Sequence, residues 1–301
     1  MRVLVTGGAG FIGHNIALHL IREGYDVVVV DNVERSSEHV LKKLSEHGVP
    51  VVRADVRSFS RYGSFEVVVH AAAYVSVEES VREPLKYIEN NVLGTARVGY
   101  ECAMRTLKLI YLSSAAVYGE PVRIPVDEEH PTHPLSPYGL SKLQGEEVLK
   151  NFARVYGLKF VVLRLFNVYG PWQNPAYAGV ITNFIERVLR DEPPIIYGDG
   201  EQTRDFIYVK DVARVVKFFV KNNVFNNETY NIGSGTPTSI RELAGTIIKL
   251  FNKNLSPIYT SPRLGDIRHS IADISKIKKL TNFQPTPLEE GLRSTLKEML
   301  S

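Results

Sequence analysis

Residues 2–13 read RVLVTGGAGFIG, a β-branched run followed by three spaced glycines. The run predicts a short strand, and the amphipathic pattern that continues to about Gly24 predicts a helix. Gly7, Gly10 and Gly13 permit a tight turn, close approach of the backbone to a pyrophosphate, and close packing of the helix on the strand. Because a helix N-terminus attracts phosphate, this stretch predicts a dinucleotide-binding strand, turn and helix.

A second strand pattern, Asp26–Val30, ends in Asp31, eighteen residues after Gly13. A carboxylate at this place can accept hydrogen bonds from the adenine ribose hydroxyls, and its charge repels the additional phosphate of NADP. We therefore expect NAD as the cofactor. Arg35 is an alternative partner for a 2′-phosphate, although an arginine in a polar loop is usually solvated.

Further strand patterns alternate with helical or loop sequence at residues 50–53, 66–70, 107–112 and 159–163. This alternation predicts an α/β fold with a doubly wound parallel (Rossmann) sheet and a smaller C-terminal substrate-binding lobe. We expect residues 1–166 to form the dinucleotide-binding domain, completed by about 206–232. Residues 167–205 and 233–301 are expected to form the smaller lobe.

The composition excludes several classes of protein. With 301 residues, 44% of them apolar, the chain can bury a large core. Its net charge of +3 is dispersed, which argues against nucleic acid as a partner. No hydrophobic leader or membrane-length apolar stretch is visible, so we expect a cytoplasmic protein without a membrane partner. Cys102 is the single cysteine and fits a buried structural thiol, and no metal-ligand cluster is visible, so no metal is expected.

The candidate catalytic residues follow the expected fifth strand. Ser113 and Ser114 end that strand, and Tyr138 and Lys142 follow at a spacing of four residues. That spacing places them one helical turn apart on the same face, where the ammonium can favour the ionised phenol. A free phenol has a pKa of about 10, so lowering it by ~3 units requires roughly 4 kcal/mol. Tyr138 is therefore a candidate base, the alternative being an ordinary exposed helix face.

Ligand-binding positions are also expected at the carboxyl ends of the other strands, where a doubly wound sheet places its ligands. Asp55 and Val56 follow the third strand, and Ala71–Ala73 follow the fourth. Small alanines allow a cofactor to approach the backbone, although ordinary tight packing is the alternative. The helix expected from about 84 to 105 carries the polar residues Asn90 and Asn91.

The glycine motif, Ser114, Tyr138 with Lys142, the run LRLFN at 163–167 and the run QTRD at 202–205 occur in order. On these motifs the whole chain resembles the extended short-chain dehydrogenase/reductases, and within them the UDP-glucose 4-epimerases. The resemblance implies NAD-dependent epimerisation at C4 of a UDP-hexose through a transient 4-keto sugar. It also implies a homodimer packed through helices around 84–105 and 138–157.

The resemblance assigns site residues by position. The implied catalytic triad is Ser114, Tyr138 and Lys142. The implied NAD contacts are Gly7, Gly10, Phe11, Ile12, Gly13, Asp31, Asn32, Asp55, Val56, Ala71, Ala72, Ala73, Asn91, Tyr138, Lys142 and Phe166. The implied UDP-sugar contacts are Ser114, Asn167, Arg204, Arg263, Asp266 and Ser270.

Several alternatives remain open at this point. Nucleotide-sugar 4,6-dehydratases and UDP-glucuronate decarboxylases share the resemblance, but they typically carry a carboxylate where this chain has Ala115 and Ala116. A non-catalytic NAD-binding sensor or scaffold is an alternative of another class. Val75 replaces a lysine that some epimerases place near the NAD phosphates. Ser270, where a bulky tyrosine narrows the sugar pocket in some relatives, predicts that N-acetylamino sugars are accepted, unless Tyr74 or His269 fills the space.

Overall fold

The computed structural model describes residues 1–58, 63–174, 179–262 and 267–300. The chain divides into two compact units. The first consists of Met1–Gly119, Pro131–Leu165 and Lys210–Tyr230, and the second of Glu120–His130, Phe166–Val209 and Asn231–Ser301. The expected boundaries did not include the segment 120–130 in the second unit. That segment is held there because Val126 bridges Ala272 and Glu128 accepts a hydrogen bond from Asn231 N at 2.8 Å.

The first unit is built on a seven-stranded sheet in the order β10-β6-β5-β4-β1-β2-β3. Its strands are β1 (Arg2–Thr6), β2 (Asp26–Asp31), β3 (Val51–Arg53), β4 (Val67–His70), β5 (Lys108–Ser114), β6 (Lys159–Leu165) and β10 (Thr229–Ile232). All pairings among β1 to β6 are parallel. The chain builds outward from β1 in one direction and from β4 in the other, so the expected doubly wound α/β fold is confirmed.

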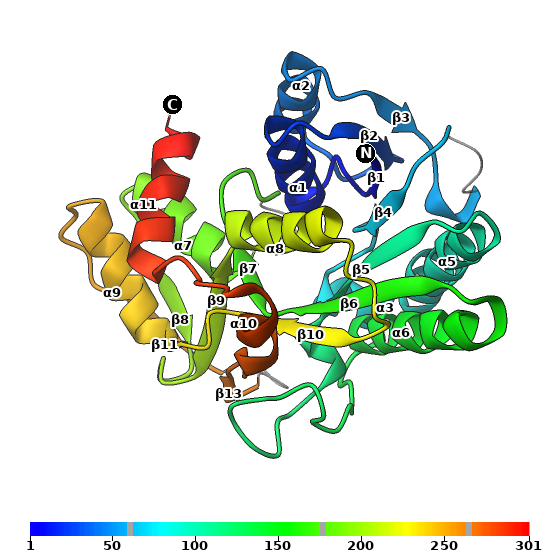
Figure 1. Ribbon diagram of the computed structural model, residues 1–301. Coiled ribbons are helices and arrows are strands. Elements are labelled where there is room, and N and C mark those ends of the chain that lie inside the picture. Colours follow the sequence, from blue (N-terminus) through cyan, green and yellow to red (C-terminus); the bar gives the residue numbers. More distant parts are fainter. Residues whose placement is uncertain (59–62, 175–178, 263–266, 301) are drawn as a thin grey trace. The chain divides into compact units, whose positions relative to one another are not determined.

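The helices of this unit flank the sheet. They are α1 (Phe11–Arg22), α2 (Glu38–Glu46), η1 (Val56–Ser58), α3 (Val77–Arg82), α4 (Pro84–Tyr87), η2 (Ile88–Leu93), α5 (Gly94–Met104), η3 (Ala115–Val117), α6 (Pro137–Tyr156) and α8 (Val209–Asn222). Helices α5 and α6 lie side by side (Figure 1) and approach closely because Gly99 has no Cβ, which would lie 2.5 Å from Leu149 Cδ2. The helix expected over 84–105 is interrupted by η2, a π-helical turn.

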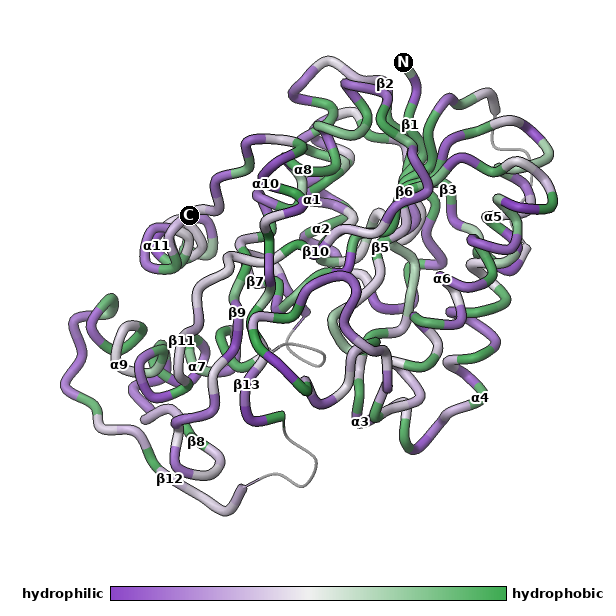
Figure 2. Tube along the Cα trace, turned by 60° about the horizontal axis from the view of Figure 1, so that its bottom comes forward, coloured by the Kyte–Doolittle hydropathy of each residue, from purple (hydrophilic) through white to green (hydrophobic). Residues whose placement is uncertain are grey.

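The core explains why the strand sequences lack polar alternation. Both faces of the sheet are covered, so whole strands are apolar, and Figure 2 shows the central strands in hydrophobic green while the flanking helices alternate. Val28, Val68 and Leu109 belong to one buried cluster that also contains Cys102. The Cys102 thiol is free, and burial raises its pKa. It is therefore part of the core, as the sequence predicts.

The second unit carries two small sheets. The strands are β7 (Asn167–Tyr169), β8 (Ile195–Tyr197), β9 (Thr203–Tyr208), β11 (Pro237–Ser239), β12 (Ile258–Thr260) and β13 (His269–Ser270), and the helices are α7 (Val180–Leu189), α9 (Ile240–Leu250), α10 (Ser275–Thr281) and α11 (Leu288–Met299). Strand β9 is central, since β7, β11 and β13 all pair with it. Asp205 on β9 is buried and accepts hydrogen bonds from Ser234 N, Gly235 N and Ala272 N, which fixes the neighbouring turn.

Candidate active site

The strand order of the first unit reverses between β1 and β4, and the carboxyl ends of these strands define the candidate site. His70 at the end of β4 joins both strands to α5, because its Nδ1 lies 2.7 Å from Thr6 Oγ1 and its Nε2 lies 3.0 Å from Thr95 Oγ1. Thr95 donates its own proton to Asn91 O, so His70 carries its proton on Nε2. Burial lowers the pKa of His70 to about 3, and the ring is a neutral structural link that the sequence analysis missed.

The glycine loop packs directly on the segment that follows β4. Gly7 has a φ of 66°, and a Cβ there would lie 2.5 Å from Ala72 Cα. A Cβ on Gly13 would lie 2.2 Å from Gly7 O, so two of the three glycines are required by close contacts. Gly10 caps α1, whose first turn contains Phe11 and Ile12 and no acidic residue. The loop therefore leaves an electropositive helix N-terminus that fits a pyrophosphate.

Asp31 links the glycine loop to the end of β2. Its side chain is buried, Oδ2 accepts from Ala9 N at 3.0 Å, and Oδ1 accepts from Val33 N at 2.8 Å. Burial raises the pKa of Asp31, while the hydrogen bonds from Val33 and Ala9 act in the opposite direction. A carboxylate has about four acceptor positions, so Asp31 retains capacity for a ribose hydroxyl. Asn32 next to it shapes the loop by accepting from Glu34 N at 3.1 Å.

Two other expected cofactor contacts have strong partners within the chain. Asp55 accepts from Arg57 Nε at 2.9 Å and from Arg57 Nη2 at 2.7 Å, and these hydrogen bonds lower the pKa of Asp55. Val56 is buried in the core, close to the backbone of Gly94. Asp55 thus lies at the expected strand end with its charge paired, a feature that the sequence analysis did not anticipate.

Asn91 holds the alanine segment 71–73 in place. Its Nδ2 donates to Tyr74 O at 3.0 Å and to Ser141 Oγ at 2.9 Å, while its Oδ1 accepts from Tyr74 N. The side chain is buried on η2, and π-helical turns of this kind are frequent at functional sites. Asn91 therefore ties the loop after β4 to helix α6.

The structure brings Ser114 and Tyr138 together. Ser114 ends β5 and accepts from Ala116 N at 3.1 Å, which leaves its own proton available for the hydrogen bond that it shares with the Tyr138 phenol. Helix α6 comes this close to η3 because Gly139 lacks a side chain, and a Cβ there would lie 2.5 Å from Ala116 O. Gly139 is a site residue that the sequence analysis missed, although it lies inside the tyrosine–lysine motif.

The effect of Lys142 on the phenol stays a prediction. Lys142 Nζ donates to Leu112 O at 2.8 Å. Burial lowers the pKa of Lys142 to about 7, although Glu146 opposes this shift. Burial also raises the pKa of Tyr138, and only the hydrogen bond with Ser114 opposes it. Desolvation of each group therefore disfavours its charged form.

A buried ion pair fixes the helix that carries these residues. Glu146 on α6 accepts from Arg164 Nε at 3.0 Å and from Arg164 Nη2 at 2.7 Å, and also from Ser113 Oγ at 2.5 Å. The side chains of Glu146 and Arg164 are 0% and 5% exposed. The pair attaches α6 to β5 and β6, and an arginine inside an otherwise apolar strand was the only sign of it in the sequence.

In the second unit, three of the expected substrate residues lie on neighbouring strands. Ser270 on β13 is the register partner of Arg204 on β9, and Asn167 on β7 is the partner of Phe206 on β9. Asn167 Nδ2 donates to Asp205 O at 3.1 Å, and Arg204 Nη1 donates to Thr203 O at 2.9 Å.

For the other expected residues of this unit, the structure gives either no position or a different one from that expected. Arg263 and Asp266 lie outside the described residues. Phe166, expected in the first domain, begins the second unit, where its backbone N donates to Ile232 O at 2.9 Å. His269, the alternative filler of the space at Ser270, has its Nδ1 at 2.8 Å from Thr203 Oγ1.

A family model, described as the NAD dependent epimerase/dehydratase family, matches residues 3–233. The chain belongs to this family. The expected membership is thereby confirmed, and NAD is the cofactor. The glycine loop, the N-terminus of α1 and Asp31 fit this cofactor, since they offer a phosphate site and a ribose acceptor within one continuous stretch.

Curated and solved relatives of this epimerase/dehydratase extend over the whole chain. A putative UDP-glucose 4-epimerase of Methanocaldococcus jannaschii is 41% identical, and the match covers 99% of this chain and 98% of that protein. The structure of UDP-glucose 4-epimerase from Thermotoga maritima with UDP-glucose has a TM-score of 0.92 at 38% identity and covers 100% of both chains. UDP-N-acetylglucosamine 4-epimerase from Methanobrevibacter ruminantium, in complex with UDP-N-acetylmuramic acid, has a TM-score of 0.92 at 37% identity, with 99% and 98% covered.

Two kinds of feature are absent from the part of the chain that the structure describes. No helix among the described residues is long and apolar enough to span a membrane. The same residues contain no group of three or more histidine, cysteine or acidic side chains that could hold a metal ion.

Glu146→Ala should lower the free energy of unfolding by about 3–5 kcal/mol, because it removes the buried carboxylate that pairs with the buried guanidinium of Arg164. Urea denaturation measures the change. The matched control is Glu147→Ala on the same helix. Glu147 pairs with Lys150 and is 58% exposed, so its loss should cost less than about 1 kcal/mol. Equal effects of the two substitutions would contradict the role assigned to the buried pair.

Asp31→Ala should weaken binding of NAD by about 10-fold or more and of NADP far less, because it removes a ribose acceptor and an anion that repels phosphate. Nucleotide dissociation constants check this. Asp26→Ala, at the other, exposed end of β2 where Asp26 pairs with Arg2, is the control and should change neither constant. An equal loss for both nucleotides would show that Asp31 does not contact the ribose.

Proposed function

We propose that this protein is an NAD-dependent 4-epimerase of UDP-hexoses, acting on UDP-glucose and UDP-galactose and also on their N-acetylamino counterparts. The observation that carries the proposal is the Tyr138 phenol hydrogen-bonded to Ser114 at the end of β5, next to alanines at 115 and 116. The relatives that cover the whole chain support it, since their names describe 4-epimerases of UDP-glucose and of UDP-N-acetylglucosamine.

In the proposed reaction, Tyr138 as phenolate accepts the proton of the sugar 4-hydroxyl, and Ser114 holds that hydroxyl by a hydrogen bond. When bound, NAD supplies the hydride acceptor and a cationic ring that favours the phenolate. A 4-keto sugar results, and once it presents its opposite face for return of the hydride to C4, Tyr138 returns its proton to the 4-oxygen. One tyrosine serves both halves, because the second half is the reverse of the first with inverted geometry.

Lys142 is proposed to hold the cofactor ribose and to add positive charge near the phenol. Its burial lowers its pKa to about 7, so its ammonium can also exchange a proton near neutral pH. Leu112 O fixes the position of the amine through a 2.8 Å hydrogen bond. The raised pKa of Tyr138 means that these added charges are needed before the phenol can act as a base.

Dehydration and decarboxylation require acid-base groups that are missing from the positions after Ser114. A dehydratase must move a second proton during elimination, and a decarboxylase must manage a later intermediate, whereas Ala115 and Ala116 form the short helix η3 and cannot transfer protons. A non-catalytic sensor would not need the hydrogen bond between Ser114 and Tyr138. These observations favour epimerisation over both classes of alternative.

We propose that the second unit binds the UDP-sugar through Asn167, Arg204 and Ser270, with Arg263 and Asp266 from the segment outside the described residues. The register pairing of Ser270 with Arg204 supports this, because it places a small hydroxyl beside a cation that can bind phosphate. The serine leaves more volume than a tyrosine would, which supports acceptance of the N-acetyl group.

A homodimer is proposed through α5 and α6. Tyr100 and Met104 on α5 are 40% and 49% exposed, and Val155 and Tyr156 on α6 are 60% and 45% exposed. Tyr100 packs edge-on against Tyr156, with ring centroids 5.8 Å apart, so the exposed apolar side chains are contiguous. A contiguous exposed apolar face of this kind is typical of an interface.

Incubation with UDP-, dTDP- and GDP-sugars, followed by NMR of the products, tests the function directly. An epimerase gives the C4 epimer of the same mass. A 4-keto-6-deoxy product would indicate a dehydratase, release of carbon dioxide from UDP-glucuronate would indicate a decarboxylase, and no conversion of any sugar would favour the sensor.

Tyr138→Phe should lower turnover by at least ~100-fold, because the variant keeps the ring but loses the proton acceptor. Folding and NAD binding should stay close to those of the wild type, as thermal unfolding and nucleotide binding would show. Tyr100→Phe on α5, which also loses only a hydroxyl, is the control and should retain activity. Wild-type turnover in Tyr138→Phe would remove this tyrosine from the mechanism.

Ser270→Tyr should lower kcat/KM for UDP-N-acetylgalactosamine by ~10-fold or more while changing that for UDP-galactose much less, because the ring occupies the volume of the N-acetyl group. Steady-state kinetics with both sugars measures this selectivity. Ser275→Tyr, at the exposed start of α10, is the control for adding a tyrosine to this unit. The assignment of Ser270 fails if the wild type ignores the N-acetyl sugar or if both sugars are affected equally.

A further inference from the structure

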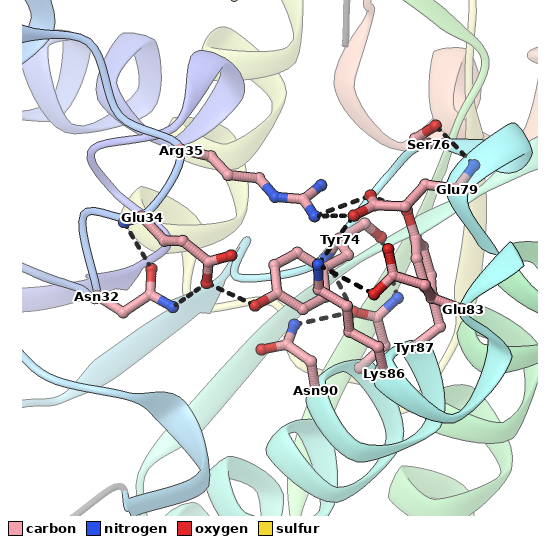
Figure 3. A network of polar contacts seen from close by, with 11 residues as sticks. Asn32, Glu34, Arg35, Tyr74, Ser76, Glu79, Glu83, Lys86, Tyr87 and Asn90 are labelled. Atoms are coloured by element: carbon pink, nitrogen blue, oxygen red, sulfur yellow. Dashed lines mark hydrogen bonds and ion pairs between the residues drawn. The ribbon is translucent and has the colours of Figure 1, made fainter. Parts of the chain in front are cut away.

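A cluster of polar and aromatic side chains surrounds Glu79 on α3 (Figure 3). Both carboxylate oxygens of Glu79 accept from Arg35 Nη2, at 2.7 and 2.8 Å. Lys86 Nζ and the Tyr87 hydroxyl each donate to the same carboxylate at 2.9 Å. The Glu79 side chain is only 12% exposed, so these contacts are protected from solvent and firmly hold the arginine.

Arg35 reaches this cluster from the loop that begins at Asp31. Its guanidinium carbon lies 4.0 Å from the ring centroid of Tyr74, which is a close cation–π contact. The Tyr74 hydroxyl donates to Glu34 at 2.6 Å, so the residue before Arg35 is bound to the same ring. The arginine is therefore positioned by both a carboxylate and an aromatic face, and its side chain is 16% exposed.

Each cation of the cluster has a carboxylate partner. Burial opposes ionisation of Glu79, but the hydrogen bonds from Lys86, Arg35 and Tyr87 lower its pKa to about 2, so it is an anion throughout the neutral range. Glu34 adds a second acidic side chain and Lys86 a second cation. The loop after β2 therefore carries the buried acid Asp31 together with Arg35, whose positive charge is already paired with Glu79.

This arrangement bears on the choice between NAD and NADP. In dinucleotide-binding sheets an acid at the end of the second strand binds the ribose hydroxyls of NAD, whereas a nearby arginine accommodates the 2′-phosphate of NADP. This chain has both residue types, four positions apart. The sequence alone cannot say which one acts, because the partner of Arg35 lies 44 residues further along the chain.

We propose that Glu79 is a cofactor-specificity residue: it holds Arg35 in an ion pair and so denies the 2′-phosphate of NADP the cation that would neutralise it. Glu79 acts through Arg35 and is a positioning residue. Exclusion of NADP then has two parts, repulsion by Asp31 and removal of the counter-charge by Glu79. The proposal rests on the assignment of the Asp31 loop to the ribose of the cofactor.

The test is the ratio of NADP to NAD retained by the protein after equilibration with an equimolar mixture, measured by chromatography of the nucleotides released on denaturation. Only folded protein retains nucleotide, so the ratio does not depend on the folded fraction. Glu79→Gln should raise the ratio by about 10-fold or more. Arg35→Ala alone should leave it within about threefold of wild type, and the double variant should lose the increase.

Two further variants serve as controls. Glu83→Gln removes a carboxylate that pairs with Lys86 at 3.6 Å and is 54% exposed, and it should leave the ratio unchanged. Asp31→Ala tests the underlying assignment: if it leaves the ratio unchanged, the ribose assignment itself has failed. If Asp31→Ala raises the ratio and Glu79→Gln does not, only the role of Glu79 is overturned.

Persistence of the increase in the Glu79→Gln/Arg35→Ala double variant would also overturn the proposal, because Glu79 would then act without Arg35. Should Glu79→Gln retain no nucleotide, Glu79→Ala provides the same comparison, because it also removes the carboxylate that pairs with Arg35. An increase that disappears when Arg35→Ala is added supports the proposal. No increase in Glu79→Ala overturns it.

Discussion

The buried pair of Glu146 and Arg164 is the interaction on which the catalytic geometry depends. A charge removed from water is tolerated only when its hydrogen bonds are complete, and Glu146 meets this condition through Arg164 and Ser113. These contacts fix α6 against two adjacent strands. Lys142 and Tyr138 lie one and two turns before Glu146 on the same helix. The position of the proposed base therefore follows from a pair that takes no part in the chemistry.

The cofactor loops and the catalytic helix belong to one connected framework within the first unit. The glycine loop touches the backbone at Ala72, and Asn91 binds the end of that segment to Ser141 on α6. His70 joins β1, β4 and α5. These links are made by small residues and neutral polar groups, so none of them adds a buried charge to this part of the unit.

Local sequence pattern was sufficient for the alternating strands and the glycine turn, because these depend on neighbours within one strand or one helical turn. The meeting of Ser114 on β5 with Tyr138 on α6 was expected only from the family resemblance. The local pattern did not predict contacts and pKa values that depend on burial or on partners far away in the sequence. The ammonium of Lys142 bonds to Leu112 O, thirty residues earlier, and desolvation controls its pKa. Glu79 and Arg35 meet across 44 residues, and no spacing rule relates such positions. The inclusion of segment 120–130 in the second unit likewise depends on a remote bridge to Ala272.

The π-helical turn Ile88–Leu93 has a consequence for how this chain can vary. An α-helix rotates by about 100° per residue, and a π turn accommodates extra residues within one revolution. Deleting the extra residue here would let the backbone close into regular α-helix while the flanking positions keep their register. Thr95 would keep its contact with His70, whereas Asn91, which lies within the turn, would lose its direction toward Tyr74. A one-residue deletion should therefore be tolerated by the helix itself but not by the link that Asn91 makes between the loop after β4 and α6.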